Sequence, residues 1–357
     1  MRAPTLGHYP LPNLRSACLE TYQWALVPFL RLFLNPGLAN VHIGFPNSDE
    51  HLYRPVIVSS IPTSNLTRLK LSNMGSGDSF SGELHDLLDE ASESLRSFSL
   101  DGELSTEIIE KLLQLHNLRR LDVRLLQAEI SPPTVLSPFL EELDVTFIGS
   151  SPEYLQILGS SLLDANPERT LTSIKCTSRV TTPLTEAGIR PLLLFRKLTT
   201  LELSASCKGG QCRIQLDDSI IFELAISLPH LTSLGLGDAP CRASTSNVTV
   251  ESLVALSTNC VGLDFLRLHF DAKDITTRDA HTDSQTHKFT CKLRTLSVGS
   301  QPLPSNRNDI LLVMFTILNI FPHVETILST EENWNQVKEG VEVFRKAPQI
   351  VPLPGKK

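Results

Sequence analysis

The stretch that decides the fold is "HNLRRLDVRL", residues 116–125. Leu118, Leu121 and Val123 stand at the spacing L-x-x-L-x-L, and charged residues fill most of the gaps. Successive side chains of an extended strand point to opposite faces, so the last two of these residues share a face that the charged residues between them do not. The stretch predicts a short strand with one buried and one open face.

The same template recurs along the chain when any aliphatic residue, Phe or a small residue is allowed at the fixed positions. Successive copies lie 22 to 33 residues apart, with a mean of about 29, at the upper end of the range for leucine-rich repeats. The copies are "LTRLKL" at 66, "LRSFSL" at 95, "LRRLDV" at 118, "LEELDV" at 140, "LTSIKC" at 171, "LTTLEL" at 198, "LTSLGL" at 231, "LDFLRL" at 263, "LRTLSV" at 293 and "VETILS" at 324. Looser copies are "LRSACL" at 14 and "LANVHI" at 38.

Between the copies the spacing of apolar residues changes to that of a helix. Ile108, Leu112 and Leu115 are three and four residues apart, which places them on one stripe of a helix. Ser105, Ser151 and Asn308 are suited to cap such helices. The predicted helical runs are 81–94, 105–117, 151–166, 216–230, 249–262 and 308–323.

One strand with one helix cannot bury its own apolar face, but stacking against neighbouring copies closes the core. We therefore predict an α/β leucine-rich-repeat solenoid, with a curved parallel β-sheet on the concave side and helices on the convex side. The expected organisation is irregular repeats over 1–45, about ten repeats over 46–330, a capping helix over 331–347 and a tail over 348–357. In the first of these segments Trp24, Phe29, Phe33 and Leu34 are candidates to cover the edge, and in the capping helix Trp334, Val337, Val341 and Phe344 are predicted to share a buried face.

The most polar segment, 271–289, interrupts the repeats and carries His281 and His287. A loop of this length is either a binding segment or a disordered insertion, and both interpretations remain open. The two histidines are six residues apart without a fixed scaffold, which does not favour a metal site.

Composition excludes several classes of function. A net charge of −7 with a pI near 5.8 argues against a nucleic-acid binder or a membrane-surface binder. The first twenty residues lack the apolar stretch of a signal peptide, and the longest apolar run, 310–318, is too short to span a membrane. We expect a cytoplasmic or nuclear protein.

Seven cysteines raise the question of metal, disulfide or core. Cys176 takes the last fixed position of its copy, which predicts a small buried residue. Cys207, Cys212 and Cys241 come near one another in sequence, but their spacing matches no standard zinc motif. We expect no metal site, no cofactor and free thiols.

A catalytic function has little support. "GDSFSG" at 77–82 places Ser79 after Gly-Asp, as around some nucleophilic serines, but its Gly/Ser-rich composition is typical of a linker. The common phosphate-binding, metalloprotease and serine-hydrolase motifs are absent from the sequence. We do not expect an enzyme.

The open face of the strands is the candidate protein-binding surface. Its charges alternate in sign between neighbouring copies, which suits a protein partner of mixed charge, and its one aromatic residue lies beside an arginine and a histidine, the residue types of an interface anchor. Alternatively, cross-strand pairs such as Arg120 with Glu142 and Arg124 with Asp144 only stabilise adjacent copies. The candidates are Arg68, Lys70, Arg120, Asp122, Arg124, Glu142, Asp144, Lys175, Glu202, Phe265, Arg267 and His269.

The segment "LPNLRSACLETYQWALVPFLRLFLNPGLANVHIGF", residues 11–45, resembles F-box-like proteins of basidiomycete fungi, in which "LPNLRSL" introduces the repeats. The resemblance extends through the repeat pattern over nearly the whole chain. It implies that the repeats hold a protein substrate, and that an F-box binds the Skp1 adaptor of a cullin ubiquitin ligase. No F-box is recognisable in this sequence, so the resemblance assigns adaptor binding to none of its residues.

Overall fold

The structure is a computed structural model. It describes residues 11, 13–20, 29, 31–45, 54–76, 80–127, 138–149, 154–166, 169–178, 184–205, 214–238, 246–277, 290–299, 303 and 306–346. The chain divides into two compact units, 1–171 and 172–357. The described strands of the main sheet are all parallel and follow one another in chain order, which makes each unit α/β.

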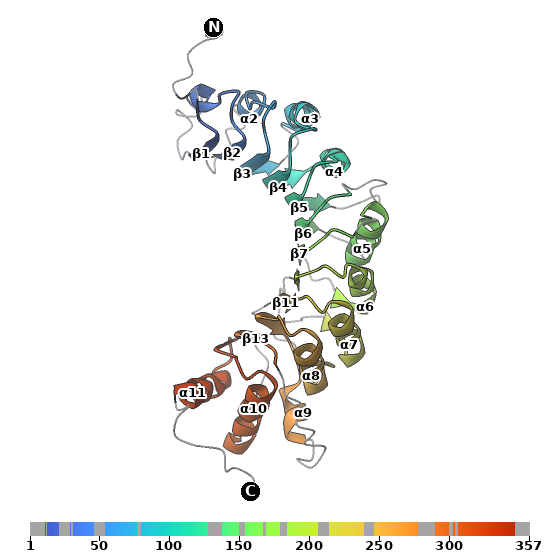
Figure 1. The fold of residues 1–357 in the computed structure, drawn as a ribbon, viewed down its shortest axis with the longest axis vertical. Helices are drawn as coiled ribbons and strands as arrows, with labels where there is room; N and C mark the ends of the chain where they lie inside the picture. Colours follow the sequence, from blue (N-terminus) through green and yellow to red (C-terminus); the bar gives the residue numbers. More distant parts are fainter. Residues whose placement is uncertain are drawn as a thin grey trace, which may run out of the picture. The chain divides into compact units, whose positions relative to one another are not determined.

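The first unit holds six strands among its described residues, each pairing with the next in parallel (Figure 1). The strands are β1 (Ser16–Glu20), β2 (Asn40–Gly44), β3 (Arg68–Ser76), β4 (Ser97–Leu104), β5 (Arg120–Gln127) and β6 (Glu142–Gly149). The helices are η2 (Arg31–Phe33), α2 (Arg54–Val58), α3 (Ser81–Glu90), α4 (Thr106–Gln114) and α5 (Tyr154–Ala165).

The second unit repeats this plan over its described residues. Its strands are β7 (Ser173–Ser178), β9 (Thr200–Ala205), β11 (Ser233–Leu236), β12 (Phe265–Leu268), β13 (Thr295–Gly299) and β14 (Thr326–Ser329). Its helical elements are α6 (Glu186–Ile189), η5 (Arg190–Leu194), α7 (Asp218–Ser227), α8 (Val250–Asn259), α9 (Ala272–Thr277), α10 (Arg307–Ile320) and α11 (Asn333–Lys346). A separate two-stranded ladder joins β8 (Leu184–Thr185) to β10 (Ile214–Gln215).

Ten described strands of the main sheet, β2 to β6, β9 and β11 to β14, begin with the same pair of backbone hydrogen bonds. In the first unit the amides of Thr67 and Arg68 both donate to the carbonyl of Ala39, at 2.8 and 3.0 Å. The pattern continues when Arg96 and Ser97 donate to the carbonyl of Thr67. In the second unit the same pattern begins where the amides of Thr199 and Thr200 donate to the carbonyl of Thr172. It repeats at each following strand of the sheet and ends where Glu325 and Thr326 donate to the carbonyl of Arg294. Copies of unequal length therefore place equivalent residues at equivalent positions.

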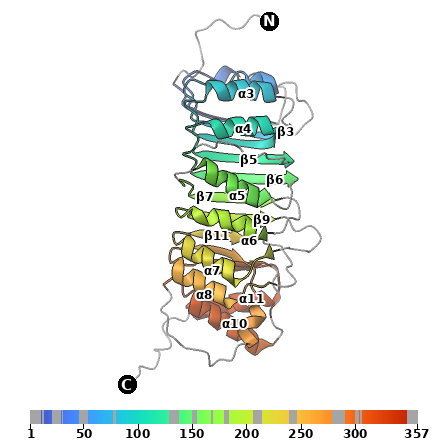
Figure 2. The same cartoon turned by 90° about the vertical axis from the view of Figure 1, so that its right-hand side faces the viewer.

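The fixed aliphatic residues form the core between the strands and the helices. Leu69, Leu71, Leu201 and Leu234 are each at most 1% exposed. Helices α2, α3 and α4 lie side by side along one face of the strands in the first unit, as do α7 and α8 in the second (Figures 1 and 2). The opposite face of each unit's strands carries the polar positions.

The predicted helical runs each contain a helix, and local chemistry sets where several of them begin. Ser105 is the N-cap of α4 as predicted, because its hydroxyl accepts from the amide of Ile108. The predicted cap Asn308 is wrong by two residues, since the side chain of Asn306 caps α10 and accepts from the amide of Asn308. Ser151 lies outside the described residues.

The C-terminal helix α11 is in place, but its predicted buried face is too wide. Trp334, Val337 and Val341 are buried, and the ring of Trp334 meets Phe270 edge-on at 6.3 Å. Phe344 is 57% exposed, so the prediction that it belongs to this buried face is wrong. Its ring instead meets Phe315 of α10 edge-on at 6.5 Å, at the rim of the helix pair.

The polar insertion predicted over 271–289 begins with a helix rather than with a loop. Helix α9 occupies its first residues, and Ala272 and Ile275 are buried in the core. His281 and His287 lie outside the described residues. The sequence pattern missed this helix because it is short and its buried positions are surrounded by charged and polar residues.

At the other end, β1 and β2 pair in the same parallel register as the later strands, so the strands of these two looser copies are regular. Leu34 is buried, whereas Phe29 and Phe33 are exposed, and Trp24 lies outside the described residues. Among the described helices, none combines the length and apolar character needed to cross a membrane.

Candidate protein-binding face

The residues between the fixed aliphatic positions lie on the open face of the strands. Lys70 lies between the buried Leu69 and Leu71, and the same alternation holds in the other strands. Among the predicted residues, exposed side chains are those of Arg68, Lys70, Arg120 and Asp122. Partly exposed are Arg124, Glu142, Asp144, Lys175, Glu202, Phe265 and Arg267.

Neighbouring strands of the first unit neutralise much of this charge. Arg120 lies opposite Glu142 and forms the predicted ion pair, at 2.9 Å. Arg124 lies opposite Thr146 rather than Asp144, and its guanidinium pairs with Asp101 of β4 at 2.5 Å. Leu100 lies opposite Val123, so this ion pair joins the next residue of each strand. Such pairs contribute at most about 1 kcal/mol each at an exposed surface.

Two cations of β3, Arg68 and Lys70, lack an ion-pair partner among the described residues. The charge of Lys70 reaches the neighbouring strand, where it lowers the pKa of His42 in addition to the larger effect of burial, while Glu20 acts in the opposite direction. The open face of the first unit therefore presents positive charge at β3.

In the second unit, outward side chains of β7 and β9 pair with one another. Lys175 and Glu202 lie opposite each other and pair at 3.2 Å. The hydroxyls of Thr177 and Ser204 are 3.0 Å apart in the next outward position. These residues thus satisfy one another across the two strands.

Arg267 of β12 lies in a different environment. Its register neighbours are small, Gly235 on β11 and Ser297 on β13. The guanidinium extends over Gly235, where a Cβ would approach Nη2 to 2.9 Å. Its Nε is buried, and within the described residues it has no hydrogen-bond partner. This is a partly desolvated cation with unused donors, two residues from Phe265.

His269 was predicted to face outward with Phe265 and Arg267, and this expectation is wrong. Its side chain is buried, and its Nε2 donates to the backbone carbonyl of Asp238 at 3.0 Å. Burial lowers the pKa of His269 most, the positive charge of Arg267 lowers it further, and the contact with Asp238 acts in the opposite direction. The alternation failed because β12 ends at Leu268, one residue before the histidine.

A groove of about 620 Å³ lies elsewhere in the second unit, between α7 and α8. Its lining includes the apolar Phe222 and Val254 and the acidic Glu223 and Glu251. None of the predicted binding residues lines this groove.

The sequence also singled out cysteines and one serine as possible metal ligands, core residues or nucleophiles. Cys176 is buried as expected of a core residue. Ser79, Cys207, Cys212 and Cys241 lie outside the described residues. One cluster that sequence reasoning missed is formed by Cys18, Glu20 and His42 on the open face of β1 and β2. The available signal was that Cys18 and His42 occupy the same outward position in two adjacent copies, with Glu20 at the next outward position.

The comparisons with known proteins add no relative from which a role could be transferred. No family model matches the chain, and no curated protein matches it.

Proposed function

We propose that this chain is a leucine-rich-repeat solenoid that acts as a non-catalytic protein-binding module, with the open face of its strands as the binding surface. The repeated backbone hydrogen bonds at the strand starts support the repeat architecture, because they make each strand and its following segment equivalent to the next. The observation that carries the binding function is Arg267, whose buried Nε has no hydrogen-bond partner among the residues that the structure describes.

A partly buried cation without a partner is costly unless another molecule completes its hydrogen bonds. Arginine and aromatic residues dominate the binding energy of protein interfaces, and Phe265 supplies the aromatic surface on the same strand. A carboxylate of a partner protein is the matching group, because a guanidinium can bind it through two parallel hydrogen bonds.

The more specific proposal is that the module is the substrate-recognition arm of an F-box-type ubiquitin-ligase receptor, in the cytoplasm or the nucleus. The resemblance of residues 11–45 to fungal F-box-like proteins supports this proposal. The alternative is a scaffold or adaptor that uses the same face without any link to ubiquitin. The two differ in whether the Skp1 adaptor accompanies the bound protein.

The test is affinity capture from a basidiomycete lysate with the tagged chain, quantified by mass spectrometry. Wild type is compared with Arg267→Ala and Phe265→Ala, and Arg196→Ala is the matched control, because Arg196 is an exposed arginine in the turn before β9. We expect at least one protein to be retained by wild type and the control but reduced about tenfold or more by both variants.

Retention that is equal in all four samples would contradict binding through this face. Where a partner is found, recovery of the adaptor in the same sample supports the ligase-receptor proposal. Its absence favours the scaffold alternative.

A further inference from the structure

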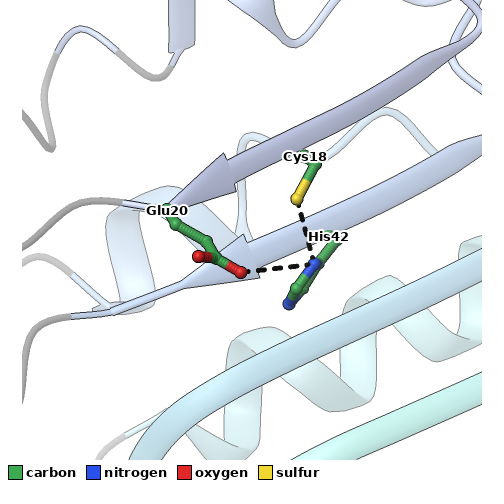
Figure 3. A group of neighbouring side chains, drawn as sticks. All are labelled: Cys18, Glu20 and His42. Atoms are coloured by element: carbon green, nitrogen blue, oxygen red, sulfur yellow. Dashed lines mark hydrogen bonds and ion pairs between the residues drawn. The ribbon is translucent and has the colours of Figure 1, made fainter.

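Three potential metal ligands converge on the open face of β1 and β2 (Figure 3). Cys18 and Glu20 project from β1, and His42 projects from β2, directly opposite Cys18. The Sγ of Cys18 lies 3.2 Å from Nδ1 of His42, and a carboxylate oxygen of Glu20 lies 3.9 Å from the same nitrogen. The three ligand atoms all lie within 4.8 Å of one another.

We propose that Cys18, Glu20 and His42 form a binding site for a divalent transition-metal ion, with Zn²⁺ as the preferred ion. Zn²⁺ binds thiolate sulfur at about 2.3 Å and imidazole nitrogen or carboxylate oxygen at about 2.0–2.2 Å. Tetrahedral angles with these lengths require a sulfur–nitrogen separation of about 3.5 Å and a nitrogen–oxygen separation of about 3.3 Å. The structure has 3.2 and 3.9 Å. Metal binding therefore requires the sulfur and nitrogen to separate by about 0.3 Å and the nitrogen and oxygen to approach by about 0.6 Å, which rotations of the exposed Cys18 and Glu20 side chains can supply.

The hydroxyl of Ser72 supports the histidine as a ligand. It lies 3.1 Å from Nε2 of His42, on the side of the ring away from the cluster. When Nε2–H donates to Ser72, the lone pair of Nδ1 faces Cys18 and Glu20. Metal-binding histidines are commonly held in one tautomer by such a partner on the second ring nitrogen.

Gly44 makes room for the glutamate. It lies opposite Glu20, and a Cβ at this position would approach the Cγ of Glu20 to 3.1 Å. A larger residue would hold the side chain of Glu20 away from β2. With glycine, the carboxylate can lie across the strand and reach toward His42, as Figure 3 shows.

The ligand set indicates the class of metal and the type of site. A thiolate and an imidazole favour zinc and similar ions over Mg²⁺ and Ca²⁺, which prefer oxygen ligands. Three protein ligands leave a fourth position for water or for a group from a bound molecule. Cys18 and Glu20 are exposed, so this position is accessible from solvent. The proposal does not depend on the protein-binding function proposed for Arg267.

The experiment uses the full chain, freed of metal with a chelator and then titrated with Co²⁺ as a spectroscopic substitute for Zn²⁺. We expect one equivalent of Co²⁺ to produce a sulfur-to-cobalt charge-transfer band that Zn²⁺ abolishes. Cys18→Ser and His42→Gln should remove this equivalent, with at least about 100-fold weaker binding, and Ser72→Ala should weaken it by about tenfold. His85→Ala is the control, because this half-exposed histidine of α3 lies outside the cluster.

Circular dichroism of each variant establishes that the fold is intact. If Cys18→Ser fails to fold, the exposed Glu20→Gln replaces it, with an expected loss of at least about tenfold in affinity. The proposal is overturned if wild type gives no thiolate band, or if the band persists at full strength in folded Cys18→Ser and Glu20→Gln, which would place the metal at other cysteines.

Discussion

The guanidinium of Arg267 lies across Gly235 on the neighbouring strand, in the space that a Cβ would occupy. The backbone of Gly235 is not in the left-handed region, so any residue could adopt its torsions, and glycine is needed there only to leave room for the arginine. A small residue on one strand sets the conformation of a candidate binding residue on the next.

Gly235→Ala should displace Arg267 and reduce partner retention about as much as Arg267→Ala does. The added methyl group would meet the flexible end of an arginine, so the free energy of unfolding should change by less than about 1 kcal/mol. Capture and denaturant unfolding measure the two effects. Gly262→Ala is the control, because its Cβ would meet only the carbonyl of Leu231 at an ordinary 3.8 Å. Equal capture by both glycine variants would disprove the role of Gly235.

The described cysteines should differ sharply in reactivity. Cys18 is exposed, whereas Cys176, Cys260 and Cys291 are buried, and burial raises the pKa of Cys260 to about 12. Only the thiolate reacts with iodoacetamide, so Cys18 should be alkylated in native metal-free protein while the other three react only after unfolding. Peptide-level mass spectrometry follows each site. Fast native labelling of Cys260 would contradict the buried position.

Trp334 should be a major contributor to the stability of the second unit. Trp334→Ala removes a ring that is 1% exposed and should lower the free energy of unfolding by about 3–5 kcal/mol. Phe344→Ala on the same helix is the control and should cost less than about 1 kcal/mol, because Phe344 is mostly exposed. Chemical denaturation followed by circular dichroism distinguishes the two. Similar losses for both would show that α11 is packed differently.

His269 should make the second unit less stable in mild acid. Its pKa is lowered in the folded state, so below the ordinary histidine pKa of about 6.5 the unfolded chain binds a proton that the folded chain does not. Stability is then retained above that pH and falls by up to about 1.4 kcal/mol per pH unit below it. His269→Gln can still donate to the carbonyl of Asp238 and should reduce this dependence. Unfolding midpoints between pH 7.5 and 5 test it, and an unchanged slope in the variant contradicts the assignment.

The repeat pattern predicted the strands and most helices because the spacing of its apolar residues follows from which side chains are buried. Leu118, Leu121 and Val123 are buried, and Arg120 and Asp122 between them are exposed, as alternation requires. The pattern failed where an element ended or was too short to show a period. His269 follows the last residue of β12, and α9 is six residues long.

The sequence by itself determined the strand positions, the buried aliphatic layers and the outward placement of most charged residues, because these depend on the period of a strand and on the exclusion of apolar side chains from water. Only the tertiary structure decided which residues of different copies meet. The conformations of side chains on paired strands joined Arg124 to Asp101, brought Cys18 next to His42, and set Arg267 over Gly235. These contacts join equivalent positions of neighbouring copies, but the spacing does not say to which of its two neighbouring strands a side chain turns or which conformation it adopts there.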